Sequence, residues 1–174
     1  MNSLPEIHHL THIDQSGAVR MVDISKKSTT TRVAIARCAI RMSSETFDVI
    51  IQEKAQKGNV IEVARIAGIM AAKKTADLIP LCHPLSLSQV QVDFFPSKKE
   101  HFITIQSMVK THAQTGAEME ALTAVSIAAL TVYDMCKAID KGMVIDAVCL
   151  VKKTGGKSGV WERTDDTGLG IKHS

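Results

Sequence analysis

A candidate acid–base pair is the feature of this sequence that most directly suggests chemistry. Asp134 and Lys137 are three residues apart in a stretch predicted to be helical, so their side chains are neighbours on one helix face. A carboxylate beside an ammonium group can accept and return protons during a reaction. Such pairs are also common as surface ion pairs that add little stability, and the spacing alone does not separate the two interpretations.

Two glutamates begin the same predicted helix. Thr115 and Glu118 have the spacing of a capping box, which accounts for Glu118, whereas Glu120 is less needed for capping or for compensating the helix dipole. Glu120 and Asp134 are fourteen residues apart, which corresponds to roughly 21 Å along a helix. One small ligand does not easily contact both ends from one chain. A site that uses both groups is therefore predicted to combine residues from two subunits.

A short loop that carries a histidine is the next candidate. Pro80 and Pro84 bracket Leu81, Cys82 and His83 and restrict the backbone on both sides. A rigid loop that presents a histidine suggests a site, because imidazole titrates near neutral pH. Considered alone, the histidine is more simply explained as a buried side chain bonded to a backbone carbonyl.

Glycines and basic residues form a candidate anion site. Residues 152–159 read KKTGGKSG, which resembles the end of a Walker A motif without its first glycine, and no helix is predicted after Ser158, so a P-loop ATPase is not expected. The glycine N–H groups with Lys153 and Lys157 can bind an anion, although a solvated turn explains them equally well. Other basic residues suit a polyphosphate or form a solvated face: Arg32, Lys57, Arg65, Lys73 and Lys74.

The composition is that of an ordinary globular protein. The chain has 174 residues, 45% hydrophobic and 22% charged, which is typical of one folded domain. No apolar run reaches the length of a membrane span and residues 1–6 show no secretory signal, so a cytoplasmic protein without a membrane partner is predicted. A net charge of +3 and 3% aromatic residues argue against a nucleic-acid partner. The four cysteines form no C-x-x-C pair, so no metal site is predicted.

Hydrophobic periodicity predicts the elements that position these residues. Strands are expected over residues 20–25, 31–42, 89–94, 102–111 and 144–151. Helices are expected over residues 43–58, 59–79 and 115–142. Their predicted N-caps are Ser43 or Ser44, Asn59 and Thr115, and the glycines expected to end the first and last helices are Gly58 and Gly142. The apolar face of the second helix is expected to carry Val63, Ile66, Ala67 and Met70.

The order of these elements predicts an α+β fold. Strands and helices alternate as in the ferredoxin-like split βαβ sandwich, an antiparallel sheet with helices on one face. The other face must meet water, a ligand or another subunit, and the apolar content of the hairpin over residues 89–111 favours an oligomer. The predicted organisation is an N-terminal arm over residues 1–19, one domain over 20–160, and a flexible tail over 161–174.

These segments together resemble the MoaC family, the cyclic pyranopterin monophosphate synthases. Residues 77–85 (DLIPLCHPL) and 133–138 (YDMCKA), in this order, are highly specific for that family. Shorter matches are residues 10–12 (LTH), 21–23 (MVD), 57–58 (KG), 64–68 (ARIAG), 115–124 (TGAEMEALTA) and 155–159 (GGKSG). The resemblance runs from about residue 10 to about residue 160, and no motif position departs from it.

The resemblance implies a lyase that converts 3′,8-cyclo-7,8-dihydro-GTP into cyclic pyranopterin monophosphate and releases pyrophosphate, an early step of molybdenum-cofactor biosynthesis. It implies Asp134 as the catalytic acid or base, with Lys137 beside it. The substrate-binding residues are then Leu81, Cys82, His83, Met119, Glu120, Glu118, Lys57, Lys73, Arg32, Lys153 and Lys157. It also implies a homohexamer built as a trimer of dimers with sites at the dimer interfaces, an upstream radical SAM GTP cyclase, and no cofactor beyond magnesium carried by the triphosphate.

Two other classes of protein remain open at this point. A non-catalytic nucleotide-binding module would explain the basic residues and the glycine loop, but not Asp134 and Lys137 together with His83. An RNA-binding domain of the RRM kind shares the order of elements and needs exposed aromatic residues on its central strands. The predicted strands offer Phe94 and Phe102 for that purpose, without an RNP-like signature.

Overall fold

The structure, a computed structural model, describes residues 17–164, so most of the predicted N-terminal arm and residues 165–174 of the predicted tail lie outside it. Its strands are β1 (Thr30–Arg41), β2 (Leu87–Ser97), β3 (Phe102–Ala113), β4 (Val144–Thr154) and β5 (Trp161–Glu162). Its helices are α1 (Ser44–Ile51), α2 (Val60–Ala72), α3 (Thr75–Leu78) and α4 (Glu118–Cys136).

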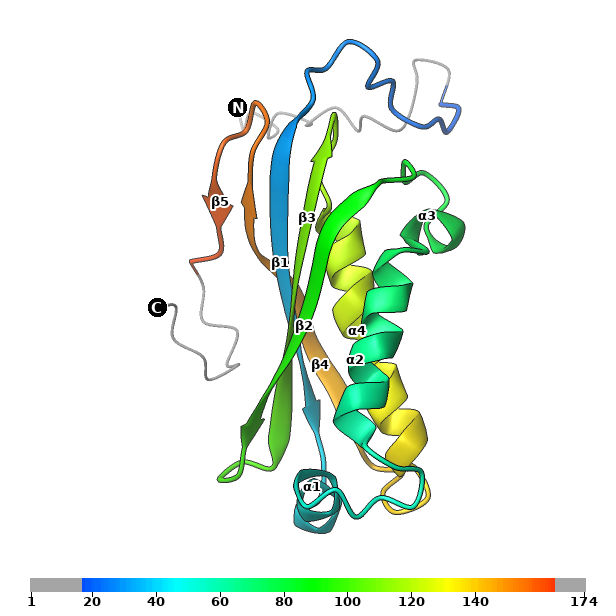
Figure 1. Ribbon diagram of the computed structural model, residues 1–174, viewed down its shortest axis with the longest axis vertical. Coiled ribbons are helices and arrows are strands. Elements are labelled where there is room, and N and C mark those ends of the chain that lie inside the picture. The colour runs from blue at the N-terminus through cyan, green and yellow to red at the C-terminus, as the bar shows by residue number, and fades with distance from the viewer. Residues whose placement is uncertain (1–16, 165–174) are drawn as a thin grey trace, which may run out of the picture.

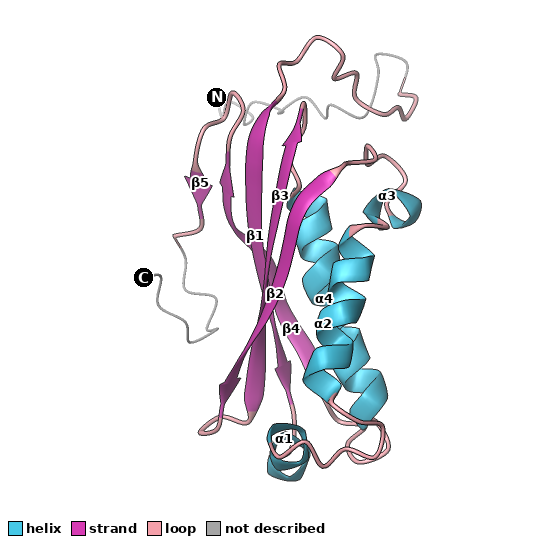
Figure 2. Cartoon of the chain, in the orientation of Figure 1, coloured by secondary structure: helices cyan, strands magenta, loops and turns pink. Residues whose placement is uncertain are grey.

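The strands form one antiparallel sheet in the order β2-β3-β1-β4-β5. The long helices α2 and α4 lie side by side on one face of this sheet (Figures 1 and 2). The predicted α+β fold with helices on one face is therefore confirmed. β5 pairs with β4 through Lys152 and Lys153, so ordered structure continues two residues into the segment predicted as a tail.

Small side chains bring the two helices and the sheet close together. α4 buries a stripe of alanine and valine residues and one cysteine against β1 and β3: Ala121, Ala124, Val125, Ala128, Ala129, Val132 and Cys136. Gly68 of α2 lies so near that an added Cβ would be 2.9 Å from the Ala124 carbonyl oxygen. By length and composition α4 also passes the test for a membrane span, a test that the core helix of a soluble protein can pass too, and half of that stretch is buried inside the fold.

Helix α1 has the predicted beginning and a different end. The Ser43 hydroxyl accepts from the Thr46 N–H at 3.2 Å, which confirms the N-cap. The helix ends before Gly58, because Glu53 takes a left-handed φ of 56° and closes a Schellman motif. In that motif the N–H of Glu53 donates to the Ile50 carbonyl at 3.1 Å, and the N–H of Lys54 donates to the Val49 carbonyl at 2.9 Å.

Three other predicted boundaries are wrong. Residues 20–25 form no strand; Asp23 Oδ1 instead accepts from the Ser25 N–H, which starts a turn. The helix predicted over 59–79 begins at the confirmed Asn59 cap but breaks into α2 and α3, where the Thr75 hydroxyl donates to carbonyls of the preceding turn. α4 begins at Glu118 after Ala117, without a side-chain cap from Thr115, and ends at Cys136 rather than near Gly142.

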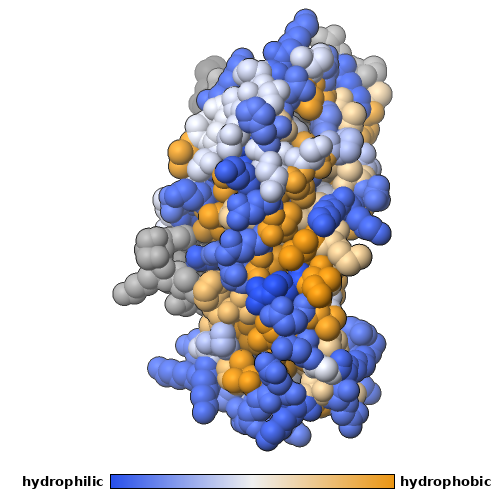
Figure 3. Space-filling model, viewed as in Figure 1, coloured by the Kyte–Doolittle hydropathy of each residue, from blue (hydrophilic) through white to orange (hydrophobic). Residues whose placement is uncertain are grey.

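The apolar stripe predicted to bury α2 faces outward instead. Val63, Ile66 and Met70 are 43%, 58% and 51% exposed, and the helix buries Val60, Ala64, Gly68, Ala71 and Ala72. Small residues occupy most of the buried face of α2, because they allow closer packing against α4 than larger side chains do. Figure 3 shows hydrophobic residues gathered at mid-height on the surface that carries α2 and β2.

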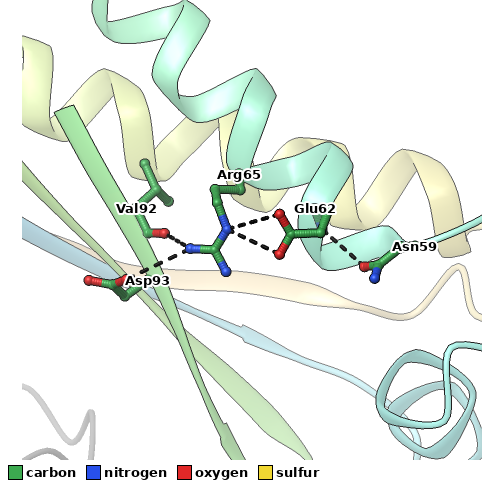
Figure 4. A network of polar contacts seen from close by, with 5 residues as sticks. All are labelled: Asn59, Glu62, Arg65, Val92 and Asp93. Atoms are coloured by element: carbon green, nitrogen blue, oxygen red, sulfur yellow. Dashed lines mark hydrogen bonds and ion pairs between the residues drawn. The ribbon is translucent and has the colours of Figure 1, made fainter.

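Arg65 ties α2 to the edge strand β2 (Figure 4). Its guanidinium donates to the Val92 carbonyl, pairs with Glu62 at 3.2 Å and lies 3.7 Å from Asp93. The same group stands 5.2 Å from the ring centre of Phe94. Arg65 is thus engaged in holding α2 against β2, although it belongs to the basic set predicted to suit a polyphosphate.

Candidate active site

A cationic cavity of about 560 Å³ lies at the end of the sheet where β1 begins and β4 ends, the upper end in Figure 1. Antiparallel pairing brings these ends together, with Val33 opposite Thr154. Four cationic side chains reach the cavity from β1, β4 and two loops: Lys27, Arg32, Lys153 and Lys157. This density of positive charge suits a ligand with several phosphates.

The glycine loop makes room for Arg32. Gly155 and Gly156 have left-handed φ values of 95° and 72°, which favour glycine. A side chain on Gly156 would overlap the Arg32 guanidinium, and one on Gly155 would overlap the Thr31 carbonyl. Arg32 Nη2 also donates to the Gln114 carbonyl at 3.3 Å. The two glycines therefore fix the guanidinium against the cavity wall, a role that the sequence motif does not reveal.

Glu118 brings a negative charge into this cationic cavity. Lys153 Nζ lies 3.1 Å from Glu118 Oε1, and both side chains are about two-thirds buried. The Glu118 carboxylate lies directly over Gly116, so close that a Cβ at position 116 would overlap it. Strand β4 and the first turn of α4 are thus joined at the cavity wall by one ion pair.

A second cavity, of about 290 Å³, adjoins the first and shares Lys27, Thr115, Gly116 and Glu118 with it. The proline-bracketed loop contributes Leu81, Cys82 and His83, and the first turn of α4 contributes Met119 and Glu120. Val22, Ile24 and Leu85 make part of its wall apolar. An apolar wall with a few polar groups is typical of small-molecule sites.

Glu120 is the buried acid of the second cavity. Its side chain is 4% exposed, and this burial raises the pKa of the carboxyl from 4.5 to about 7; a backbone hydrogen bond lowers it and the nearby Glu118 raises it further. Burial, followed by the Glu120 charge, also raises the pKa of the Cys82 thiol. Near neutral pH Glu120 can therefore donate or accept a hydrogen bond.

Asp134 and Lys137 lie at the opposite end of α4, near α1, and neither lines the two cavities. Lys137 Nζ is 2.6 Å from Asp134 Oδ1, and Lys57 Nζ is 3.4 Å from Asp134 Oδ2. The Lys137 hydrogen bond and charge, and then Lys57, lower the pKa of Asp134, whereas Asp134 raises the pKa of Lys137. Both groups are therefore ionised and largely solvated within one chain.

The predicted site residues thus fall into four places, namely the two cavities, the Asp134 cluster and Lys73, and nothing in the structure brings all of them together. Lys73 stands alone and exposed after the last turn of α2. Sequence reasoning missed Lys27, which lines both cavities, and Gln114, which orients Arg32. A double lysine in the polar run before β1 was the available signal for Lys27. Among the described residues, no group of three or more His, Cys, Asp and Glu side chains is arranged to hold a metal.

The aromatic residues considered for RNA binding are not displayed on the sheet. Phe102 is buried, and Phe94 packs against the core beneath Arg65. A base-stacking platform of the RRM kind needs such rings exposed on its central strands. The geometry of Phe94 and Phe102 therefore does not support that alternative.

The fold and the paired cavities define an α+β protein in which a cationic cavity adjoins a partly apolar one. The family model of the MoaC family matches residues 21–156, and the chain belongs to this family. Three similar proteins are each named cyclic pyranopterin monophosphate synthase. That of Desulforapulum autotrophicum is 58% identical over 151 residues, which cover 87% of this chain and 93% of the relative. Those of Thermomicrobium roseum and Chloroflexus aurantiacus are both 54% identical, over 90% and 92% of this chain and 95% and 99% of the relatives.

Proposed function

We propose that this chain is a cyclic pyranopterin monophosphate synthase, a phosphorus–oxygen lyase that acts on 3′,8-cyclo-7,8-dihydro-GTP in molybdenum-cofactor biosynthesis. One structural observation carries the proposal beyond family membership. A cavity with four cationic side chains adjoins a partly apolar cavity with one buried carboxyl group. A cyclised GTP derivative has the matching halves, since it carries a triphosphate and a hydrogen-bonding ring system.

The cationic cavity takes the triphosphate in this proposal. A sugar hydroxyl attacks the α-phosphorus, a new P–O bond closes the cyclic phosphate, and the bond to the β-phosphate breaks as pyrophosphate departs. Lys27, Arg32, Lys153 and Lys157 stabilise the negative charge that collects on the leaving group. Any magnesium enters with the triphosphate in this proposal.

The second cavity takes the guanine-derived ring. Glu120 faces it from α4, and His83 and Cys82 face it from the proline-bracketed loop. Rearranging the ring to a pterin requires several proton transfers, which favour groups that titrate near the working pH. Glu120 is such a group, because its pKa is about 7.

A second copy of the chain supplies the acid–base pair. Asp134, Lys137 and Lys57 are clustered by hydrogen bonds but lie at the far end of α4 from both cavities. In a dimer, the Asp134 end of α4 from one chain would lie beside the cavities of its partner. This contact would desolvate Asp134 and Lys137 and let them exchange protons with the bound ring. The exposed apolar stripe of α2 supports such assembly, up to a hexamer of three dimers. We place the enzyme in the cytoplasm, where a radical SAM GTP cyclase would supply its substrate.

Turnover of enzymatically prepared cyclised dihydro-GTP tests the proposal. The purified protein should release pterin product and pyrophosphate in equal amounts, and Asp134→Asn should abolish both. Asp48→Asn, an exposed change on α1, is the matched control and should keep wild-type turnover. Binding of the substrate without product would instead indicate a non-catalytic nucleotide-binding module.

Mixing two inactive variants tests whether sites are shared between chains. Lys153→Ala disables the cationic cavity of a chain, and Asp134→Asn disables its acid–base pair at the far end of α4. If each site combines both ends from two chains, random exchange of subunits should restore about a quarter of wild-type activity. A mixture that stays inactive after refolding together would contradict the shared site.

A further inference from the structure

Glu118 is the one acidic residue among the described residues that line the cationic cavity. Its carboxylate lies 3.1 Å from the ammonium group of Lys153, with both side chains about two-thirds buried. Because Gly116 has no side chain, the carboxylate can lie against the backbone there and stay beside Lys153. The fold thus maintains a negative charge at a position where the proposed function requires binding of phosphate.

We propose that Glu118 is a specificity-determining residue that weakens the binding of free pyrophosphate and so promotes release of this product. The inference rests on the proposed function, which makes pyrophosphate the leaving group. Any anion bound by Lys153 must either share its ammonium group with the Glu118 carboxylate or displace that carboxylate. Both routes reduce affinity, because like charges repel and because the existing ion pair is lost.

The position of Glu118 makes this effect selective. Glu118 lines both cavities, so it stands at the boundary between the phosphate half and the ring half of the ligand. The substrate has further contacts in the second cavity that offset the competition for Lys153. Pyrophosphate has only its phosphate contacts, and therefore experiences the competition in full. Once the bond to the α-phosphate breaks, the departing group loses its attachment to the ring and is held more weakly.

Direct titration with inorganic pyrophosphate, followed by calorimetry on the full chain, measures this effect without substrate. Glu118→Gln keeps the shape of the side chain and removes its charge. The matched control is Glu162→Gln, which removes the carboxylate that pairs with the neighbouring Lys152 at 3.2 Å, where Lys152 lines neither cavity. Each titration is run with EDTA and repeated with magnesium, so that a cation-bridged contact can be recognised.

The expected result is that Glu118→Gln binds pyrophosphate about tenfold more tightly than wild type, the change expected when a competing charge about two-thirds buried is removed. Glu162→Gln should bind within about twofold of wild type, since its ion pair is exposed. In a Lys153→Gln background the Glu118→Gln change should have a smaller effect, because the competition for Lys153 is gone and only the repulsion between the carboxylate and the anion remains. Inhibition of turnover by added pyrophosphate should strengthen in Glu118→Gln by the same factor.

Three results would overturn the inference. Equal affinity of wild type and Glu118→Gln would mean that the carboxylate does not compete for Lys153. Weaker binding by Glu118→Gln, especially with magnesium, would mean that Glu118 assists the anion through a cation. Absence of pyrophosphate binding by every variant would remove the anion site itself, and the turnover assay would then decide separately whether the proposed function stands.

Discussion

Replacing the buried acid Glu120 by glutamine should change how the stability of the protein depends on pH. The pKa of this carboxyl is raised by burial from 4.5 in the unfolded chain to about 7 in the fold. Between these values the folded protein binds one more proton than the unfolded chain. The wild-type free energy of unfolding therefore falls as pH rises through this window, and the fall is complete above the folded pKa.

The size of the effect follows from the same two pKa values. Each pKa unit corresponds to about 1.4 kcal/mol, so ionisation of Glu120 removes about 2.5 kcal/mol between pH 5 and pH 8. Glutamine has nearly the same shape and does not titrate. Relative to wild type, Glu120→Gln should therefore become more stable by about 2.5 kcal/mol across that interval.

Urea unfolding at several pH values between 5 and 8 measures this difference. The protomer concentration must be the same throughout, because assembly would contribute to the apparent stability. Glu100→Gln, in the exposed turn between β2 and β3, serves as the control and should show a nearly constant difference from wild type. A difference between Glu120→Gln and wild type that stays constant within about 0.5 kcal/mol across this range would refute a burial-raised pKa.

Three further substitutions test the backbone and packing arguments. Glu53→Gly should raise the free energy of unfolding by about 1 kcal/mol, because the exposed Glu53 occupies the left-handed position of a Schellman motif; urea unfolding checks it. Gly68→Ala should lower it by about 1–2 kcal/mol, since the clash with the Ala124 carbonyl outweighs the gain in helix propensity; thermal unfolding would show a rise instead if the helices could separate freely. Gly156→Ala should raise KM at least tenfold by displacing Arg32, with the melting temperature changed by only a few degrees; an unchanged KM would mean that Arg32 does not bind substrate.

The sheet and its order of elements could be predicted because the patterns there are simple. Alternation in β2 and β3 and the alanine–valine stripe of α4 each have one favourable face to bury. The face of α2 could not be predicted in this way, because the helix offers two: large apolar residues on one side and small ones on the other. Close packing around Gly68 selected the small face, and that choice depends on the partner helix.

The candidate site was predictable in its parts but not in its arrangement. Counting residues along α4 was sufficient to predict that Glu120 and Asp134 lie too far apart for one ligand, and the structure places them at opposite ends. The resemblance to a Walker motif did not show that Gly156 accommodates Arg32, because that contact joins two strands far apart in sequence. Lys27 was missed because it lies in a turn without periodicity.

The hydrogen bond between Arg65 and the Val92 carbonyl also bears on aggregation through the edge of the sheet. β2 is the long edge strand of the sheet, whereas β5 closes the other edge with only two residues. An open edge of this length is a template on which a foreign strand can pair and from which aggregates can grow. Arg65 occupies a backbone acceptor near the middle of that edge and places a charged group there. Its replacement by an uncharged residue would leave a longer uninterrupted edge on which another strand could pair.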